Sequence, residues 1–243
     1  MSGKIDVEDV ELSDAELITV LKNHGMSRRW LMRVFGAGAV VTALGGTASA
    51  SRGKGTRIHK VYGAPYEASE SVPSGLVDHE VELHIHPGPG AHPGFPLEGG
   101  GEFPAEFFFE PVGLRVKPGE IVEFKIHHGL HTVTSIHSKF NEPPFLDFPD
   151  RVPTANGFTS PPINTDDSWL YRFTTKGVYD IMCLPHLRFG MVVRLVVIDD
   201  GDPVPADYGP LLFPNAGEVL AARELMPGNI VSEGSVAWAD LTL

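Results

Sequence analysis

The residues best suited to chemistry lie close together in the C-terminal half of the chain. Cys183 is the only cysteine in the sequence, and His186 and Met191 follow it within one short segment. A thiolate, an imidazole and a thioether are soft or borderline ligands, the combination that selects copper. His131, farther upstream, is the candidate for a second imidazole. The four residue types together predict a binding site for one copper ion.

In the predicted site, the Cys183 thiolate and the imidazoles of His131 and His186 form a trigonal plane, and the Met191 sulfur is a weaker axial ligand. Sulfur suits Cu(I) and nitrogen suits Cu(II), so a rigid site of this kind changes oxidation state with little motion. Two alternatives use the same residues. A lone cysteine often packs as a small apolar side chain, and structural zinc sites usually contain more cysteines and rarely methionine. The joint spacing favours copper.

The predicted site needs a scaffold that brings His131 to the later ligands, and the surrounding sequence predicts short strands. Alternating or continuous apolar patterns occur at 81–85, 114–116, 121–126, 131–136, 169–173, 177–182 and 191–197. The strands 114–116 and 121–126 flank a Pro-Gly turn and are expected to belong to antiparallel sheet. Short strands at this spacing, with no helix between them, predict an all-β protein with a Greek-key β-sandwich.

Several of these segments resemble the cupredoxin family, in particular its plastocyanin, pseudoazurin and halocyanin-like members. The resemblance is carried by Val-Lys-Pro-Gly-Glu at 116–120, His-Thr-Val at 131–133, Gly-Val-Tyr-Asp at 177–180 and Cys183-x-Pro-His186-x4-Met191. It covers roughly residues 78–199. It implies a cupredoxin-like sandwich that holds one type 1 copper ion and transfers electrons rather than catalysing a reaction. By motif position, His131, Cys183 and His186 are the equatorial ligands and Met191 the axial one.

Four neighbours are expected to surround the ligands: Leu130, Thr132, Leu184 and Pro185. Thr132 stands where the family often has an asparagine that braces the ligand loop, and a hydroxyl can also donate a hydrogen bond there. The outer edge of His186 is expected near the surface. The ring of residues around it predicts an apolar docking patch for transient redox partners, formed by Leu130, Leu184, Pro185, Leu187 and Phe189, with Arg188 as a cation.

A second metal site is a weaker prediction. His84 and His86 alternate with apolar residues and fall on one solvent-facing side of a strand, and His92 follows in a Pro-Gly loop. These three histidines form a candidate auxiliary metal site. Together with His79, they support the alternative function of a copper-binding or copper-delivery protein without a redox partner.

A copper oxidase or nitrite reductase is a third hypothesis, which the sequence disfavours. Those enzymes carry a histidine beside the copper-binding cysteine, which links it to further copper centres. Here Met182 and Leu184 flank Cys183. The prediction is therefore a monomeric electron carrier and not an enzyme. A formal net charge of −12 argues against a nucleic-acid partner.

The N-terminal segment predicts export. Arg28 and Arg29 form a twin-arginine pattern before an apolar run at 34–44, and Ala48-Ser-Ala50 provides a small-x-small cleavage site. The apolar run is shorter than the ~20 residues that a membrane-spanning helix needs. The expected location is the periplasm or the outer side of the cell membrane. The mature chain is expected to have no membrane span, although an uncleaved signal would tether it.

These observations divide the chain into four parts. Residues 1–50 are a twin-arginine signal peptide with a long leading region, 51–77 a linker or arm, 78–199 the cupredoxin domain, and 200–243 a C-terminal extension. Asn215 and Glu218 predict the start of one short helix in the extension, and Pro227-Gly228 predicts its end.

Overall fold

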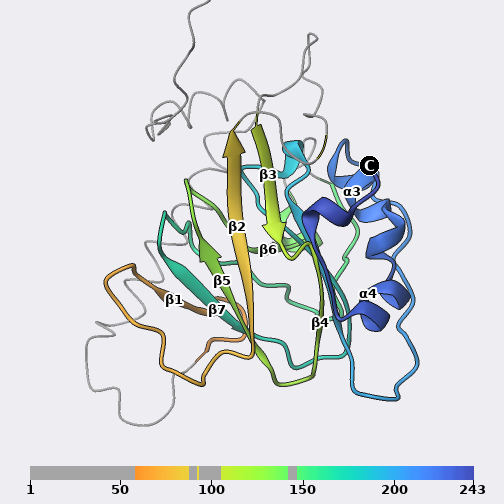
Figure 1. Ribbon diagram of the computed structural model, residues 1–243. Coiled ribbons are helices and arrows are strands. Elements are labelled where there is room, and N and C mark those ends of the chain that lie inside the picture. The colour runs from red at the N-terminus through yellow and green to blue at the C-terminus, as the bar shows by residue number, and fades with distance from the viewer. Residues whose placement is uncertain (1–57, 88–91, 93–104, 142–146) are drawn as a thin grey trace, which may run out of the picture.

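The computed structural model describes residues 58–87, 92, 105–141 and 147–243 (Figure 1). Within these ranges the chain forms two five-stranded sheets that enclose one apolar core, and the C-terminal residues pack beside the second sheet. The predicted β-sandwich with a short C-terminal helical extension is confirmed. The predicted signal peptide, residues 1–50, lies outside the described residues.

The first sheet has the strand order β1-β7-β5-β2-β3. Its parallel pair β2–β5 lies between antiparallel neighbours, so the chain leaves this sheet and returns to it. The inward side chains of β2, such as Val81 and Leu83, are fully buried, whereas Glu82 and His84 alternate with them on the outer face. The strands are β1 (Ala64–Tyr66), β2 (His79–Pro87), β3 (Ala105–Glu110), β5 (Ile121–Ile126) and β7 (Ser168–Arg172).

The second sheet has the order β10-β4-β9-β8-β6. Every residue of β9 is buried, which explains why all but Arg194 are apolar: the sandwich core lies on one side and the C-terminal extension on the other. The strands are β4 (Gly113–Val116), β6 (Thr134–Ser135), β8 (Gly177–Met182), β9 (Val192–Val197) and β10 (Ser235–Val236).

The two strands beside the Pro-Gly turn each have an antiparallel neighbour, but they do not pair with each other. β4 pairs with β9 and β10, whereas β5 pairs with β2 and β7, so the turn joins the two sheets instead of two neighbouring strands. The Glu120 carboxylate accepts from the backbone N–H of Lys117 at 2.7 Å, and Gly119 takes a positive φ of 98°. Local turn chemistry is therefore as expected, but the strands on each side find their partners far away in the sequence.

The expected strand 131–136 is shorter than predicted, since only Thr134 and Ser135 form β6. His131 instead exchanges backbone hydrogen bonds with Ile163, which lies in the long connection before β7. Part of the predicted linker is also ordered, because β1 pairs with β7 at the edge of the first sheet. Pro65 is tolerated within β1 because the strand lies at the edge of the sheet. The sequence pattern did not indicate this strand.

The C-terminal extension has two α-helices instead of the predicted one. Helix α3 (Ala216–Ala221) packs against β9, and α4 (Pro227–Glu233) packs against β4 and β9. Pro227 was expected to end a helix. It instead lies in the first turn of α4, where proline is favoured. Gly113 permits the close approach of the extension, because a Cβ there would lie 2.8 Å from Leu225.

Four short 3-10 helices complete the described structure: η1 (Ser138–Phe140), η2 (Leu187–Phe189), η3 (Arg223–Leu225) and η4 (Trp238–Asp240). Among the residues that the structure describes, no helix has the length and apolar character required to cross a membrane.

A buried ion network joins the second sheet to the loops around it. Asp180 of β8 accepts from Arg151 at 2.6 Å and from Arg194 of β9 at 2.7 Å, and none of the three side chains is more than 1% exposed. Arg194 also donates to the Leu225 carbonyl and pairs with Asp207 at 3.0 Å. One carboxylate thus holds a strand pair, a connecting loop and the C-terminal extension together.

Replacing Asp180 by asparagine should strongly destabilise the protein. The change removes the negative charge and leaves two guanidinium groups buried, which costs about 3–5 kcal/mol of unfolding free energy. Urea denaturation measures this loss. Asp200→Asn is the matched control: its ion pairs with Arg115 and Lys117 are exposed, so the midpoint should hardly move. Equal midpoints for the two variants would contradict the role of the network.

Candidate metal centre

Cys183 and Met191 lie at the two ends of the connection between β8 and β9. These strands pair antiparallel with Met182 opposite Val192. Cys183, which follows β8, therefore lies opposite Met191, which precedes β9. The Cys183 N–H donates to the Met191 carbonyl at 3.0 Å and closes the loop. Register in the sheet therefore places the two sulfur-bearing residues at one end of the sandwich.

The loop itself, which we call the ligand loop (residues 183–191), is a series of tight turns. The Cys183 carbonyl accepts from the N–H of His186, and the His186 carbonyl accepts from the N–H of Phe189 and of Met191. The 3-10 helix η2 occupies its middle, and Gly190 ends this helix in the left-handed region with a φ of 78°. These turns fold the His186 imidazole back toward Cys183.

His131 reaches the same point from the loop that follows β5. Gly129 enters this loop with a φ of 78°, which other residues adopt only with strain, and a Cβ there would also force the end of the Ile85 side chain, 2.6 Å away, to shift. The Nε2–H of His131 donates to the His128 carbonyl at 2.8 Å. Because a carbonyl can only accept, the proton resides on Nε2 and the Nδ1 lone pair is free to bind a metal.

Three candidate ligand atoms form a nearly equilateral triangle. Sγ of Cys183 lies 3.5 Å from Nδ1 of His131 and 3.4 Å from Nδ1 of His186, and the two nitrogens are 3.3 Å apart. All three residues are buried, with exposed fractions of 0%, 0% and 4% for Cys183, His131 and His186. The structure thus brings together the three residues that were predicted as equatorial ligands, and Met191 is fully buried beside them in the same loop.

The size of this triangle fits a metal ion. The centre of an equilateral triangle of this size lies about 2.0 Å from each corner, close to ordinary metal–nitrogen and metal–sulfur bond lengths. Burial raises the pKa of the Cys183 thiol to about 12 and lowers the pKa of His131 to about 4. Burial also lowers the pKa of His186 well below its ordinary value. Both imidazoles are therefore neutral donors, and a metal would displace the thiol proton.

Thr132 connects the two ligand-bearing loops. Its backbone N–H donates to Sγ of Cys183 at 3.4 Å, and its hydroxyl oxygen accepts from the backbone N–H of Leu184 at 2.9 Å. The side chain therefore braces the ligand loop as an acceptor, whereas a donor role was expected. The apolar side chain of Leu184 is buried, as is Pro185, so the surroundings of the sulfur are dry.

The predicted exposed docking patch is wrong for most of its residues. Leu184, Pro185, Leu187 and Phe189 are buried, and only Leu130 and Arg188 are partly exposed. The ring of Phe107 from β3 stacks on His186 with centroids 4.4 Å apart and on Phe189 at 4.8 Å. Asn215, next to α3, donates to the Arg188 carbonyl at 2.6 Å. Strand β3 and the C-terminal extension thus cover the ligand loop.

The structure does not bring the three auxiliary histidines together. His86 lies 3.9 Å from the Glu106 carboxylate, and the His92 ring contacts the Trp238 carbonyl at 2.7 Å. His84 instead lies beside Glu82 and His127. Neither of these two residues belongs to the predicted auxiliary site. Alternation along β2 could have revealed Glu82, but His127 follows a different strand, and only the parallel pairing of β2 with β5 places it there.

Comparison with known proteins gives relatives of one kind. A pseudoazurin of Methylorubrum extorquens is 33% identical over 98 residues, which cover 40% of this chain and 57% of that protein. A putative pseudoazurin of Rhizobium leguminosarum bv. viciae is 28% identical over 115 residues, which cover 47% of this chain and 64% of that protein. The chain thus spans less than two thirds of the length of the curated relatives it matches.

Solved structures of amicyanin also align with this chain. One of them, a reduced Cu(I) form of a mutant, shares 20% identity over 56% of this chain and 92% of its own, with a TM-score of 0.35. No family model matches the sequence.

The metal-free protein should lose stability in acid. The unfolded chain protonates its histidines near pH 6.5, whereas folded His131 stays neutral down to about pH 4, and the pKa of folded His186 is also lowered well below its ordinary value by burial. The unfolded state therefore binds more protons in this window, and the free energy of unfolding falls as pH decreases, by up to about 1.4 kcal/mol per pH unit for each imidazole.

Urea denaturation of the metal-free protein between pH 7 and pH 4 measures this slope. His131→Asn should reduce it, because one of the two buried imidazoles is removed. The same slope in wild type and variant would show that other groups cause the acid sensitivity.

Proposed function

We propose that this chain belongs to the cupredoxin family, holds one type 1 copper ion at His131, Cys183, His186 and Met191, and passes single electrons between redox proteins. The observation that carries the proposal is the buried triangle of Sγ and two Nδ1 atoms, each 3.3–3.5 Å from the next. One thiolate, two neutral imidazoles and a nearby thioether are the donor set of blue-copper sites. When bound, copper supplies a one-electron Cu(I)/Cu(II) couple.

The chain's own contribution is rigidity. His131 is fixed by its hydrogen bond to the His128 carbonyl, and Cys183 is held by the β8–β9 register and by Thr132. Ligands that cannot relax keep the same arrangement in both oxidation states, so little reorganisation accompanies the transfer of an electron. Burial excludes water, which would otherwise add ligands to the oxidised ion.

The aromatic cover defines the proposed route to a partner. Phe107 stacks on His186 and is itself buried, so an electron that leaves through this imidazole passes through packed apolar side chains. A partner would therefore dock near Leu130 and Arg188, the partly exposed residues of the predicted patch. Transient redox complexes have small interfaces, so a limited surface suffices.

Export by the twin-arginine route to the periplasm or the cell surface is part of the proposal. Its support is the Arg28-Arg29 pattern, the short apolar run and the cleavage site after Ala50. Copper delivery, the alternative, depended on a group of exposed histidines. Within the described ranges, His79, His86 and His92 each contact a carboxylate or a carbonyl separately, so they do not support it, and His84 alone of the four lies in a cluster of possible ligands, with Glu82 and His127.

Loading the purified protein with Cu(II) should produce an intense blue absorption band, which arises from charge transfer between the cysteine sulfur and copper. Cys183→Ser should abolish the band, because a hydroxyl cannot replace the thiolate. Absorption spectroscopy and metal analysis should together find one copper ion per chain. A colourless copper-loaded wild type would refute the type 1 assignment.

Met191→Leu should leave the blue band in place but raise the reduction potential, because the oxidised ion loses a weak sulfur donor. Met182→Leu is the matched control: Met182 is equally buried and adjoins Cys183, but it lies in β8. Its potential, measured by redox titration, should match that of the wild type. If both leucine variants shift the potential alike, Met191 has no special role at the metal.

A further inference from the structure

The outer face of the first sheet carries a second group of metal-binding side chains, apart from the buried centre. Glu82 and His84 project from β2, and His127 directly follows β5, the parallel neighbour of β2. We propose that Glu82, His84 and His127 form a second metal site that binds one divalent ion of the zinc and copper class.

The donor atoms of these three residues converge. Nε2 of His84 lies 3.0 Å from one oxygen of the Glu82 carboxylate, and Nε2 of His127 lies 3.0 Å from the other. All the candidate donor atoms lie within 4.8 Å of one another. Donors that share an ion at a bond length of ~2.1 Å stand roughly 3.0–3.4 Å apart, so the site needs only a small contraction.

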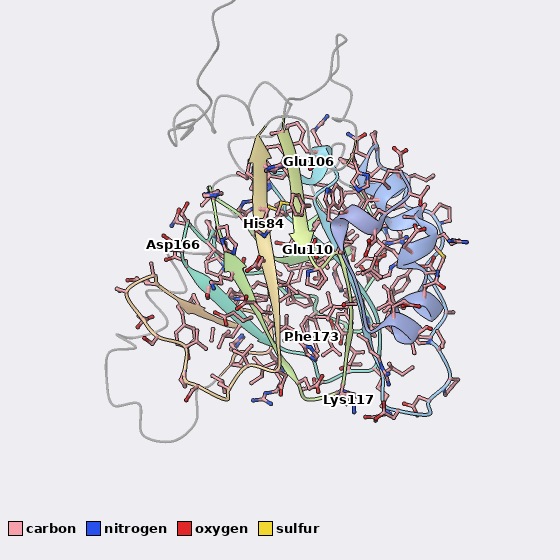
Figure 2. The ribbon with its side chains drawn as sticks, in the orientation of Figure 1. His84, Glu106, Glu110, Lys117, Asp166 and Phe173 are labelled. Atoms are coloured by element: carbon pink, nitrogen blue, oxygen red, sulfur yellow. The ribbon has the colours of Figure 1, made fainter. Side chains whose placement is uncertain are left out.

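Aromatic packing orients the two imidazoles. The rings of His84 and His127 stack with centroids 4.6 Å apart and an interplanar angle of 7°. Phe108 of β3 stacks on the other side of His84 at 5.2 Å, and Trp238 stacks in turn on Phe108 at 5.4 Å. Figure 2 shows His84 on β2 beside β3, which carries Glu106 and Glu110. The stack fixes the direction of the Nε2 atoms before any ion arrives.

His127 faces the same carboxylate as His84. Its Nε2 atom is shielded from solvent and lies at ion-pair distance, 3.0 Å, from Glu82. A metal ion between the nitrogen and the carboxylate would bond to both in place of this direct contact.

The donor set decides the class of ion. Two imidazoles and one carboxylate bind zinc in sites that keep a fourth position open for water, and the same donors bind Cu(II) more tightly. Calcium and magnesium prefer oxygen donors. The side chains of Glu82, His84 and His127 are 33%, 25% and 35% exposed, so an ion can enter from solvent.

The neighbouring charges favour a cation. Glu110 lies opposite Glu82 in the β2–β3 register and adds a second carboxylate. Lys125 lies opposite Glu82 in the other direction, but its amino group is 4.0 Å from the Glu80 carboxylate. The site differs from the buried centre in every ligand, so it does not depend on the proposed electron-carrier function.

Isothermal titration of the copper-loaded protein with Zn²⁺, followed by dialysis and metal analysis, tests the proposal. One zinc ion per chain is expected without loss of the blue band. Because coordination requires all three donors, Glu82→Gln, His84→Asn and His127→Asn should each weaken zinc binding at least tenfold. His79→Asn is the matched control: His79, at the start of β2, also pairs with a glutamate, Glu120, at 2.7 Å.

Three outcomes separate the two proposals. If zinc does not bind, or if binding is unchanged in His84→Asn and His127→Asn with folding confirmed by circular dichroism, the second site is refuted. If the protein never becomes blue, the titration is repeated on Cys183→Ser, and zinc binding that still depends on His127 supports the second site alone. A second equivalent of Cu²⁺ that binds without added blue absorption also supports it, because no thiolate lies at this site.

Discussion

Most of this architecture depends on the buried ion pairs of the Asp180 carboxylate. It lies in β8, three residues before Cys183, and accepts from Arg151 in the long connection and from Arg194 in β9. Through Arg194 it also reaches the Leu225 carbonyl and Asp207. A buried charge of this kind stabilises only when its partners are complete, so it specifies one arrangement of strand, loop and extension. The ligand loop begins where this fixed region ends.

Two sets of contacts connect the candidate centre to that region and set its geometry. The β8–β9 register brings Cys183 to Met191, and Thr132 joins the His131 loop to Cys183 and Leu184. These connections include backbone groups, and the Thr132 connection also uses its buried hydroxyl. The three donor atoms therefore stand at metal-binding separations without an ion, and the free energy of keeping two imidazoles and a thiol in a dry interior comes from the surrounding sandwich.

Sequence reasoning found what depends on local pattern. The Cys-x2-His-x4-Met spacing predicted a loop between two strands, and apolar runs located most strands to within a few residues. It failed where contacts between segments far apart in the sequence determine the structure. Whether the strands beside Pro118 pair with each other depends on partners elsewhere, and Pro227 starts a helix because of packing against β4. The cover of Phe107 over His186, and the meeting of His127 with Glu82, both depend on sheet order, which no local spacing encodes.

The C-terminal extension has a consequence for the order of events during synthesis. The ligand loop leaves the ribosome before Asn215, which bonds the Arg188 carbonyl, and before Leu225, whose carbonyl accepts from Arg194. Strand β10 supplies its hydrogen bonds to β4 later still. A nascent chain that ends shortly after β9 thus contains all four candidate ligands, the β8–β9 pairing and Thr132, but lacks the contacts that the extension adds. The cover of the ligand loop should therefore be complete only after the extension has been translated.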